Sequence, residues 1–194
     1  MTSREKILAR VVQNQPAMIP LPNMLSGQLT ETSTVDLFKS VFQTIGGTII
    51  ELDTLEEIAH YLTANFTDRG RIISTLPELS GVTEPAWENQ NPHDFENIDL
   101  AIIKSHFGVA ENAALWITEE LMQQRVIPFI CQQLAVVVSK KDIVPDMHRA
   151  YEIIGNSEYG FGTFIAGPSK TADIEQSLVL GAHGPKSMII FLVP

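Results

Sequence analysis

The sequence predicts a single α/β domain with a mostly parallel sheet of about seven strands and helices on both sides. Short apolar runs, which are typical of buried strands, alternate with helical patterns from Thr48 onwards. The chain has 194 residues, 44% of them hydrophobic, which suits one domain with a sizeable core. Neither an internal repeat nor a shift in composition indicates a second domain.

The first 34 residues predict a helix and a surface arm, and residues 35–194 predict the α/β domain. Ser3 can cap the first helix, in which four apolar side chains share one face: Ile7, Leu8, Val11 and Val12. Such a helix packs on its own domain or serves a partner. The polar, proline-bearing residues 14–32 predict a loop over the surface.

Strands and helices alternate through the first half of the predicted domain. Predicted helices cover residues 33–45, with Ser33 and Asp36 as a capping box, and 53–65; predicted strands cover residues 48–52, 71–74 and 99–103. We expect Asp99 to fix the start of its strand. Residues 75–98 hold three prolines and form the least regular stretch, which is either functional or poorly ordered.

The second half of the domain continues the alternation. Predicted strands cover residues 115–117 and 134–138, and predicted helices cover residues 118–125 and 142–154, the second capped by Asp142. Two further apolar runs, residues 161–166 and 187–193, predict strands with a short helix between them. This arrangement would be a βαβ unit.

The predicted turn after residue 166 is a candidate ligand site. Gly167 interrupts the strand, and Ser169 or Thr171 can cap the short helix. Ser169, Lys170 and Thr171 then lie where free backbone N–H groups point outwards, which favours an anion such as sulfate, phosphate or a carboxylate. The alternative is ordinary capping, with Asp173 complementing the helix dipole.

Two runs near the C-terminus resemble a known signature. Residues 167–175 read Gly-Pro-Ser-Lys-Thr-Ala-Asp-Ile-Glu, and residues 181–185 read Gly-Ala-His-Gly-Pro. They resemble the C-terminal signature of the lactate-utilisation protein C family, the LUD domain. The resemblance implies a fold similar to sugar-phosphate isomerases and coenzyme A transferases. It also implies a role in bacterial L-lactate oxidation to pyruvate alongside iron–sulphur partner proteins.

The second run adds two residues to the predicted ligand site. His183 stands between small residues in a turn, where its ring can hydrogen-bond a carboxylate ligand or tie the turn to the backbone. Gly184 follows it. The predicted ligand-binding residues are therefore Gly167, Ser169, Lys170, Thr171, Asp173, His183 and Gly184.

Two segments depart from the family pattern. Where the family usually reads Gly-Ile-Ala-Glu-Thr-Gly-Thr, this chain keeps Glu111 but carries Asn-Ala-Ala at residues 112–114. Gln133 occupies the place of a common family histidine. Glu111 is the candidate catalytic residue, because the coenzyme A transferases that the resemblance implies use a strand-end glutamate as covalent nucleophile. The alternative is a solvated or salt-bridged acid.

Composition and motifs argue against several partners and cofactors. A net charge of −10 disfavours nucleic acid. The single cysteine, Cys131, permits neither an internal disulfide nor a cysteine-ligated cluster, and we expect a buried, inert thiol. The sequence has neither a nucleotide-binding glycine loop nor a metal-type His/Cys cluster, so no cofactor or dedicated metal site is predicted. Its longest apolar run is far below the ~20 residues that a membrane helix needs.

The resemblance implies a component of bacterial lactate utilisation that acts with iron–sulphur partners. Together with the composition and the predicted turn, it predicts a cytoplasmic protein that binds a small carboxylate or phosphate-bearing ligand. One alternative is a stand-alone isomerase or acyl/coenzyme A-transfer enzyme on a small anionic substrate, with Glu111 as base or nucleophile. Another is a structural or regulatory subunit with a degenerate pocket, which the changes at residues 112–114 and 133 favour over the first alternative. Whether the chain catalyses a reaction, and whether it forms an oligomer, stays open.

Overall fold

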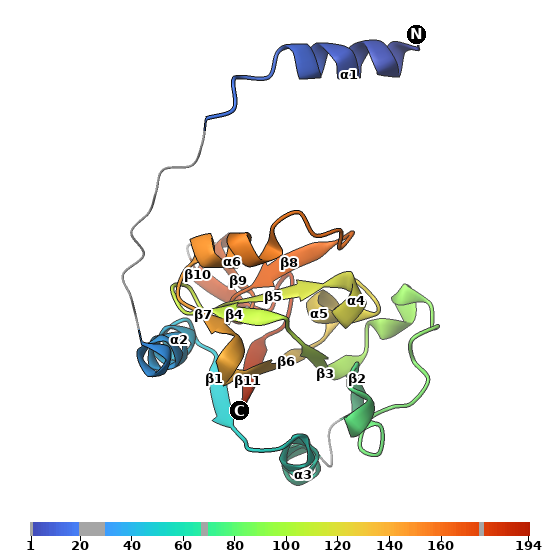
Figure 1. The fold of residues 1–194 in the computed structure, drawn as a ribbon. Coiled ribbons are helices and arrows are strands. Elements are labelled where there is room, and N and C mark those ends of the chain that lie inside the picture. Colours follow the sequence, from blue (N-terminus) through green and yellow to red (C-terminus); the bar gives the residue numbers. More distant parts are fainter. Residues whose placement is uncertain (1, 20–29, 67–69, 175–176) are drawn as a thin grey trace.

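A five-stranded parallel sheet forms the centre of the molecule (Figure 1). The computed structural model describes residues 2–19, 30–66, 70–174 and 177–194, without the side chains of residues 31 and 172–178. The strand order is β1-β11-β6-β3-β2. The strands are β1 (Thr48–Glu51), β2 (Arg71–Ser74), β3 (Ile98–Lys104), β6 (Gln133–Ser139) and β11 (Ser187–Val193). The predicted α/β class with a mostly parallel central sheet is confirmed.

Two of the predicted strands belong to a second sheet. It has the order β7-β4-β5-β8, and its strands are β4 (Phe107–Val109), β5 (Ala114–Thr118), β7 (Ile143–Val144) and β8 (Gly162–Ile165). Side chains of β5 alternate between two faces. Leu115 and Ile117 pack on the central sheet, and Trp116 packs with Phe164 on the opposite face.

Helices complete a layered arrangement around the two sheets (Figure 1). They are α1 (Ser3–Gln13), α2 (Glu31–Thr44), α3 (Leu55–Phe66), α4 (Glu119–Met122), α5 (Ile127–Ile130) and α6 (Met147–Ile154), with short 3₁₀ turns at Pro77–Leu79, Pro92–Phe95 and Lys140–Asp142. α3 covers the outer face of the central sheet, and α6 covers the outer face of the second sheet. None of the described helices has the length and hydropathy that a membrane crossing requires.

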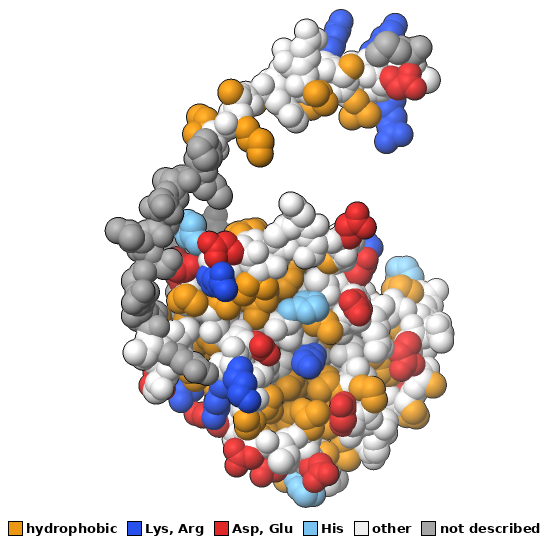
Figure 2. All heavy atoms as spheres, in the orientation of Figure 1, with side chains coloured by type: hydrophobic (Ala, Val, Ile, Leu, Met, Phe, Trp, Pro, Cys, Tyr) orange, Lys and Arg blue, Asp and Glu red, His pale blue; other side chains and the backbone are white. Residues whose placement is uncertain are grey.

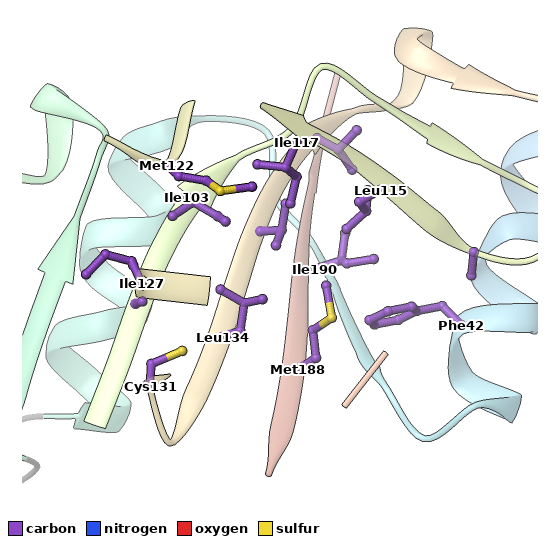
Figure 3. Close-up of a cluster of buried hydrophobic side chains, with 14 of the residues drawn as sticks. Phe42, Ile103, Leu115, Ile117, Met122, Ile127, Cys131, Leu134, Met188 and Ile190 are labelled. Carbon is purple, nitrogen blue, oxygen red and sulfur yellow. The ribbon is translucent and has the colours of Figure 1, made fainter. Parts of the chain in front are cut away.

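The main core lies between the two sheets and α2 (Figure 3). Ile103, Leu134 and Ile190 from the central sheet face Leu115 and Ile117 from β5, and all five are fully buried. Neighbouring residues on the same strands, such as Phe191, point to the other face and pack with α3. Parallel strands that are covered on both faces require nearly continuous apolar sequence, which explains why these strands are readable in the chain.

Three predicted helix caps are corrected by the structure. Thr2 caps α1 in place of Ser3, Thr30 caps α2 in place of Ser33, and Asp146 caps α6 in place of Asp142. Each predicted cap lies within four residues of the observed one, where hydroxyl or carboxylate side chains compete for the same role. The start of α6 is delayed because residues 143–144 pair with β4 as strand β7.

The irregular stretch at residues 75–98 is held in place by Arg71. Its guanidinium donates to both carboxylate oxygens of Glu84, at 2.6 and 2.9 Å, and holds the pKa of that carboxyl below its usual value. Trp87 and Phe95 anchor the stretch in the core. Asp99 accepts a hydrogen bond from the Arg71 backbone N–H at 2.9 Å, which confirms that it fixes the start of β3 against β2.

The helix predicted within residues 169–180 is wrong. The chain forms two antiparallel strands, β9 (Lys170–Ile174) and β10 (Ser177–Leu180). Gly167 and Gly181 turn the chain at the two ends, with φ of +77° and +78°. Thr, Ile and Val are stiff at χ1 and favour a pleated strand, and here they outweigh the local capping pattern. The predicted βαβ unit is therefore replaced by a hairpin.

The N-terminal helix α1 has no buried residue. Its four apolar side chains at positions 7, 8, 11 and 12 are between 52% and 68% exposed. The surface loop predicted for residues 14–32 lies partly outside the described residues, which exclude 20–29. The domain boundary at residue 35 stays a prediction, and α2, which begins at Glu31, crosses it.

Candidate functional site

The two C-terminal sequence runs meet at one turn, which we call the signature turn (residues 167–170 and 181–186). The Ser169 N–H donates to the Pro185 carbonyl at 2.9 Å, and the Gly181 N–H donates to the Ser169 carbonyl at 3.0 Å. The Lys186 N–H donates to the Gln132 carbonyl at 2.8 Å, just before β6 and β11 begin. The signature turn therefore lies at the amino ends of β6, the central strand of the sheet, and of its neighbour β11.

Glycine at position 184 keeps the Ser169 side chain accessible. A Cβ atom there would lie 3.1 Å from Ser169 Cβ and 3.5 Å from its Oγ. A larger side chain at position 184 would therefore crowd the hydroxyl. Gly167 has a different role in the turn: its φ of +77° lies in the left-handed region, which glycine adopts without strain.

Two lysines give the signature turn its positive charge. Lys170 is exposed and pairs with Leu180 in the hairpin, and Lys186 packs against Gly181. His183 is also exposed. A hydroxyl, two ammonium groups and an imidazole are suitable donors for a carboxylate or phosphate.

The structure places the other predicted ligand residues as follows. Thr171 is half-buried and pairs with Val179. The side chain of Asp173 lies outside the described part of the chain. Lys186 follows His183-Gly184-Pro185 directly and was not predicted from the sequence as a ligand residue. Its positive charge beside a glycine turn could have indicated that role.

Gln133 also lies at this edge of the sheet. It is half-buried, begins β6 and pairs with Ser187 of β11, immediately after the signature turn. The position where the family commonly carries histidine is thus a neighbour of the signature in space. Sequence reasoning noted the substitution but had no means to place it beside residues 50 positions further on.

Glu111 lies in a different part of the molecule, between β4 and β5. Its Oε2 accepts a hydrogen bond from the Met147 N–H at 3.0 Å, at the first residue of α6, and its own N–H donates to the Pro145 carbonyl. Asn112 closes the same turn by accepting from the Ala114 N–H at 3.0 Å. The contacts of Glu111 and Asn112 thus hold the β4–β5 turn and the start of α6.

Replacing Glu111 by glutamine separates a catalytic role from a structural one. Its hydrogen bond to Met147 needs only a carbonyl-type acceptor, which glutamine keeps, so we expect stability within about 0.5 kcal/mol of the wild type by thermal unfolding. Glu111→Ala should cost about 0.5–2 kcal/mol, as for other lost caps. A nucleophile or base needs the carboxylate, so a rate loss of a hundredfold or more in Glu111→Gln would support catalysis, and an unchanged rate would contradict it.

A second hollowed region lies at the opposite, carboxyl edge of the central sheet, and we call it the carboxyl-edge cleft. It consists of two adjoining hollows of about 450 and 410 Å³, both lined by Glu120 and Asp142. A seven-residue strand separates this edge from the signature turn by roughly 20 Å. Figure 2 shows the face that carries the C-terminus, with apolar side chains interrupted by charged ones and a histidine.

His106 is the notable polar residue of this cleft, and sequence reasoning missed it. Its Nε2 lies 2.8 Å from the Thr118 hydroxyl. Burial lowers the pKa of His106; the nearby charge of Glu120 opposes this shift, and that of Lys104 adds to it. The net shift is downward, so the neutral ring is favoured at pH 7. The acidic side chains that line the cleft (Glu78, Glu120, Asp142 and Glu158) outnumber its lysines (Lys104 and Lys141). This balance disfavours an anion here and favours the signature turn as the anion site.

Cys131 is buried, and its burial raises the pKa of the thiol to about 12. The thiol therefore stays protonated at neutral pH, which agrees with the expected inert role. Among the described residues, His, Cys, Asp and Glu side chains form no group of three suited to a metal ion.

Comparison with known proteins identifies similar chains. A sequence model of the LUD domain matches residues 43–193, which include both sheets and the signature turn. Lactate utilization protein C of Bacillus pumilus is 30% identical over 125 residues, covering 58% of this chain and 52% of the relative. The proteins of that name from Geobacillus kaustophilus and Bacillus subtilis are 31% and 30% identical over 118 and 121 residues, covering 58% and 56% of this chain and 49% and 50% of the relatives.

The chain thus spans about half the length of these curated relatives. A solved structure, that of a DUF162 family protein from Deinococcus radiodurans, aligns with a TM-score of 0.66 at 13% identity, covering 86% of this chain and 100% of that one. This similarity shows a shared fold.

Proposed function

Since this chain belongs to the LUD domain family, we propose that it is a cytoplasmic component of bacterial lactate utilisation that binds a small anionic ligand and acts with iron–sulphur partner proteins. The observation that carries the proposal is the signature turn, whose two segments are joined by backbone hydrogen bonds at one edge of the sheet and include Ser169, Lys170, His183 and Lys186. Relatives named Lactate utilization protein C support the pathway.

The proposed ligand is a short carboxylate such as L-lactate or pyruvate, or a phosphate-bearing molecule. Its anionic oxygens would accept from the ammonium groups of Lys170 and Lys186 and from the Ser169 hydroxyl. Such charge-assisted hydrogen bonds are about twice as strong as neutral ones. His183 would add a further donor in the same turn.

The electrons of lactate oxidation would pass to a partner. An iron–sulphur cluster with cysteine ligands needs several thiolates, and this chain has a single, buried thiol. We therefore assign the clusters to partner proteins, and ligand binding to this chain.

Reconstitution tests this division of roles. The purified chain, supplied with L-lactate and an artificial electron acceptor, should show no oxidation. Cluster-loaded iron–sulphur proteins of lactate utilisation should make turnover appear, and leaving this chain out should then lower the rate at least tenfold. Pyruvate formation is the readout, and a Lys170→Gln, Lys186→Gln double variant is the matched control for ligand binding.

Two outcomes would contradict the proposal. Oxidation of lactate by the chain alone would remove the need for partners. Equal rates with and without the chain would place it outside the electron-transfer reaction, and would favour a structural or regulatory role.

A further inference from the structure

One hollow of the carboxyl-edge cleft is an open, apolar groove, which we call the aromatic groove. It has a volume of about 450 Å³, and its apolar lining consists of Phe107, Trp116, Val144, Ile153, Ile154 and Tyr159. Phe107 and Trp116 form a nearly buried floor, whereas Ile153 is 48% and Tyr159 is 37% exposed. The groove thus presents apolar surface to solvent.

Three carboxylates surround this groove: Glu120, Asp142 and Glu158. None of them forms an ion pair with any residue in the described part of the chain. Lys141 is the one lysine on the same lining. The rim therefore has an excess of negative charge, which Lys141 offsets only in part.

Helix α1 has the complementary properties. Ile7 and Val11, and Leu8 and Val12, are spaced four residues apart, so they form one apolar stripe that is exposed along its length. Arg4, Lys6 and Arg10 exceed the single acid Glu5, which gives the helix a positive charge. An isolated helix of 11 residues is marginal in water, so its stability requires a surface on which to pack.

We propose that α1 of one copy of this chain docks in the aromatic groove of a second copy. The apolar stripe would cover Ile153 and Tyr159, and the basic side chains would face the carboxylates of the rim. Reciprocal exchange of the two helices gives a closed dimer with twofold symmetry. Residues 14–30, which join α1 to α2, span at most about 60 Å when extended, so the arm is long enough to reach a neighbouring molecule.

This inference does not rest on the proposed function. The ligand is assigned to the signature turn, whereas the docking surface is formed by side chains of β4, β5 and α6, none of which belongs to that turn. Loss of dimerisation and loss of anion binding are therefore separate results.

Sedimentation equilibrium of the full chain tests the proposal. We expect a dimer at micromolar concentration, and at least a tenfold weaker dimer for Leu8→Asp on the helix and for Ile153→Asp in the groove. Val82→Asp is the matched control, since Val82 is 36% exposed and lies outside both surfaces. It should leave the dimer unchanged. Because α1 buries no residue within its own chain, Leu8→Asp should leave the melting temperature unchanged at protein concentrations where the wild type is monomeric.

A charge exchange tests the pairing itself. Arg10→Glu and Glu158→Arg should each weaken the dimer, and the two together should restore most of the loss. A monomeric wild type, or a dimer that neither apolar variant affects, would overturn the proposal. If the wild type is monomeric and Leu8→Asp nevertheless alters the fluorescence of Trp116, α1 docks in the groove of its own chain, which also overturns the proposal.

Discussion

Replacing Lys170 and Lys186 together by glutamine is expected to weaken binding of inorganic phosphate by a hundredfold or more. Each ammonium group can make a charge-assisted hydrogen bond worth roughly 1.5–3 kcal/mol, and glutamine keeps the polarity but removes the charge. Two such losses exceed the ~2.7 kcal/mol that a hundredfold change represents. Isothermal titration calorimetry at low ionic strength, where charge effects are largest, measures the change.

Lys141→Gln is the matched control for this experiment. Lys141 is also an exposed lysine, but it lines the carboxyl-edge cleft. It should bind phosphate as the wild type does. An equal loss of phosphate affinity in this control would indicate a general charge effect. Unchanged phosphate affinity in the double variant would contradict an anion site at the signature turn.

Replacing Phe42 by alanine is expected to lower the free energy of unfolding by about 3–5 kcal/mol, because a large cavity replaces a buried ring. Phe42 is fully buried and stacks on Phe38 with ring centroids 6.3 Å apart. Its ring also fills the space beside Gly47, where a Cβ atom would lie 2.1 Å away. A domain of this size should lose roughly 6–20 °C in Tm.

Leu37→Ala on the same helix is the control for Phe42→Ala. Leu37 is 37% exposed, so its loss should cost well below half as much. Similar losses from the two variants would mean that α2 does not pack in the main core as described. Chemical denaturation of both variants gives the comparison, provided that their m-values agree.

Much of the central sheet could be predicted from sequence because its strands are covered on both faces. Five residues of β6, Leu134–Val138, are buried, and the same holds for residues 188–192 of β11. Such runs are recognisable without any tertiary information. The order of the strands in the sheet could not be predicted in this way, because it depends on packing between segments that are distant in the sequence.

The hairpin of β9 and β10 could not be predicted from local pattern. Residues 169–175 combine a helix-cap pattern, Ser-Lys-Thr with acids in the next turn, with residues that also suit strands. The turns at Gly167 and Gly181, joined through the Ser169 carbonyl, decide the outcome. Ser169 and Gly184 therefore lie side by side without the helix that motivated the predicted site.

His106 was missed for a similar reason. It has no histidine or cysteine at helical spacing, and its partner Thr118 is 12 positions away. The antiparallel pairing of β4 with β5 brings the two strands together. Gln133 likewise reaches the signature turn only through the pairing of β6 with β11.

The most direct test of the anion site is a nuclear magnetic resonance titration of the full chain with L-lactate, pyruvate and phosphate. At least one of these ligands should shift the backbone amide signals of Ser169, Lys170, Gly184 and Lys186 in a saturable manner. The signals of His106, Thr118 and Glu120 in the carboxyl-edge cleft should stay in place. Saturable shifts confined to the cleft would contradict an anion site at the signature turn. So would the absence of any saturable shift at ligand concentrations on the order of tens of millimolar, which suffice to detect weak binding.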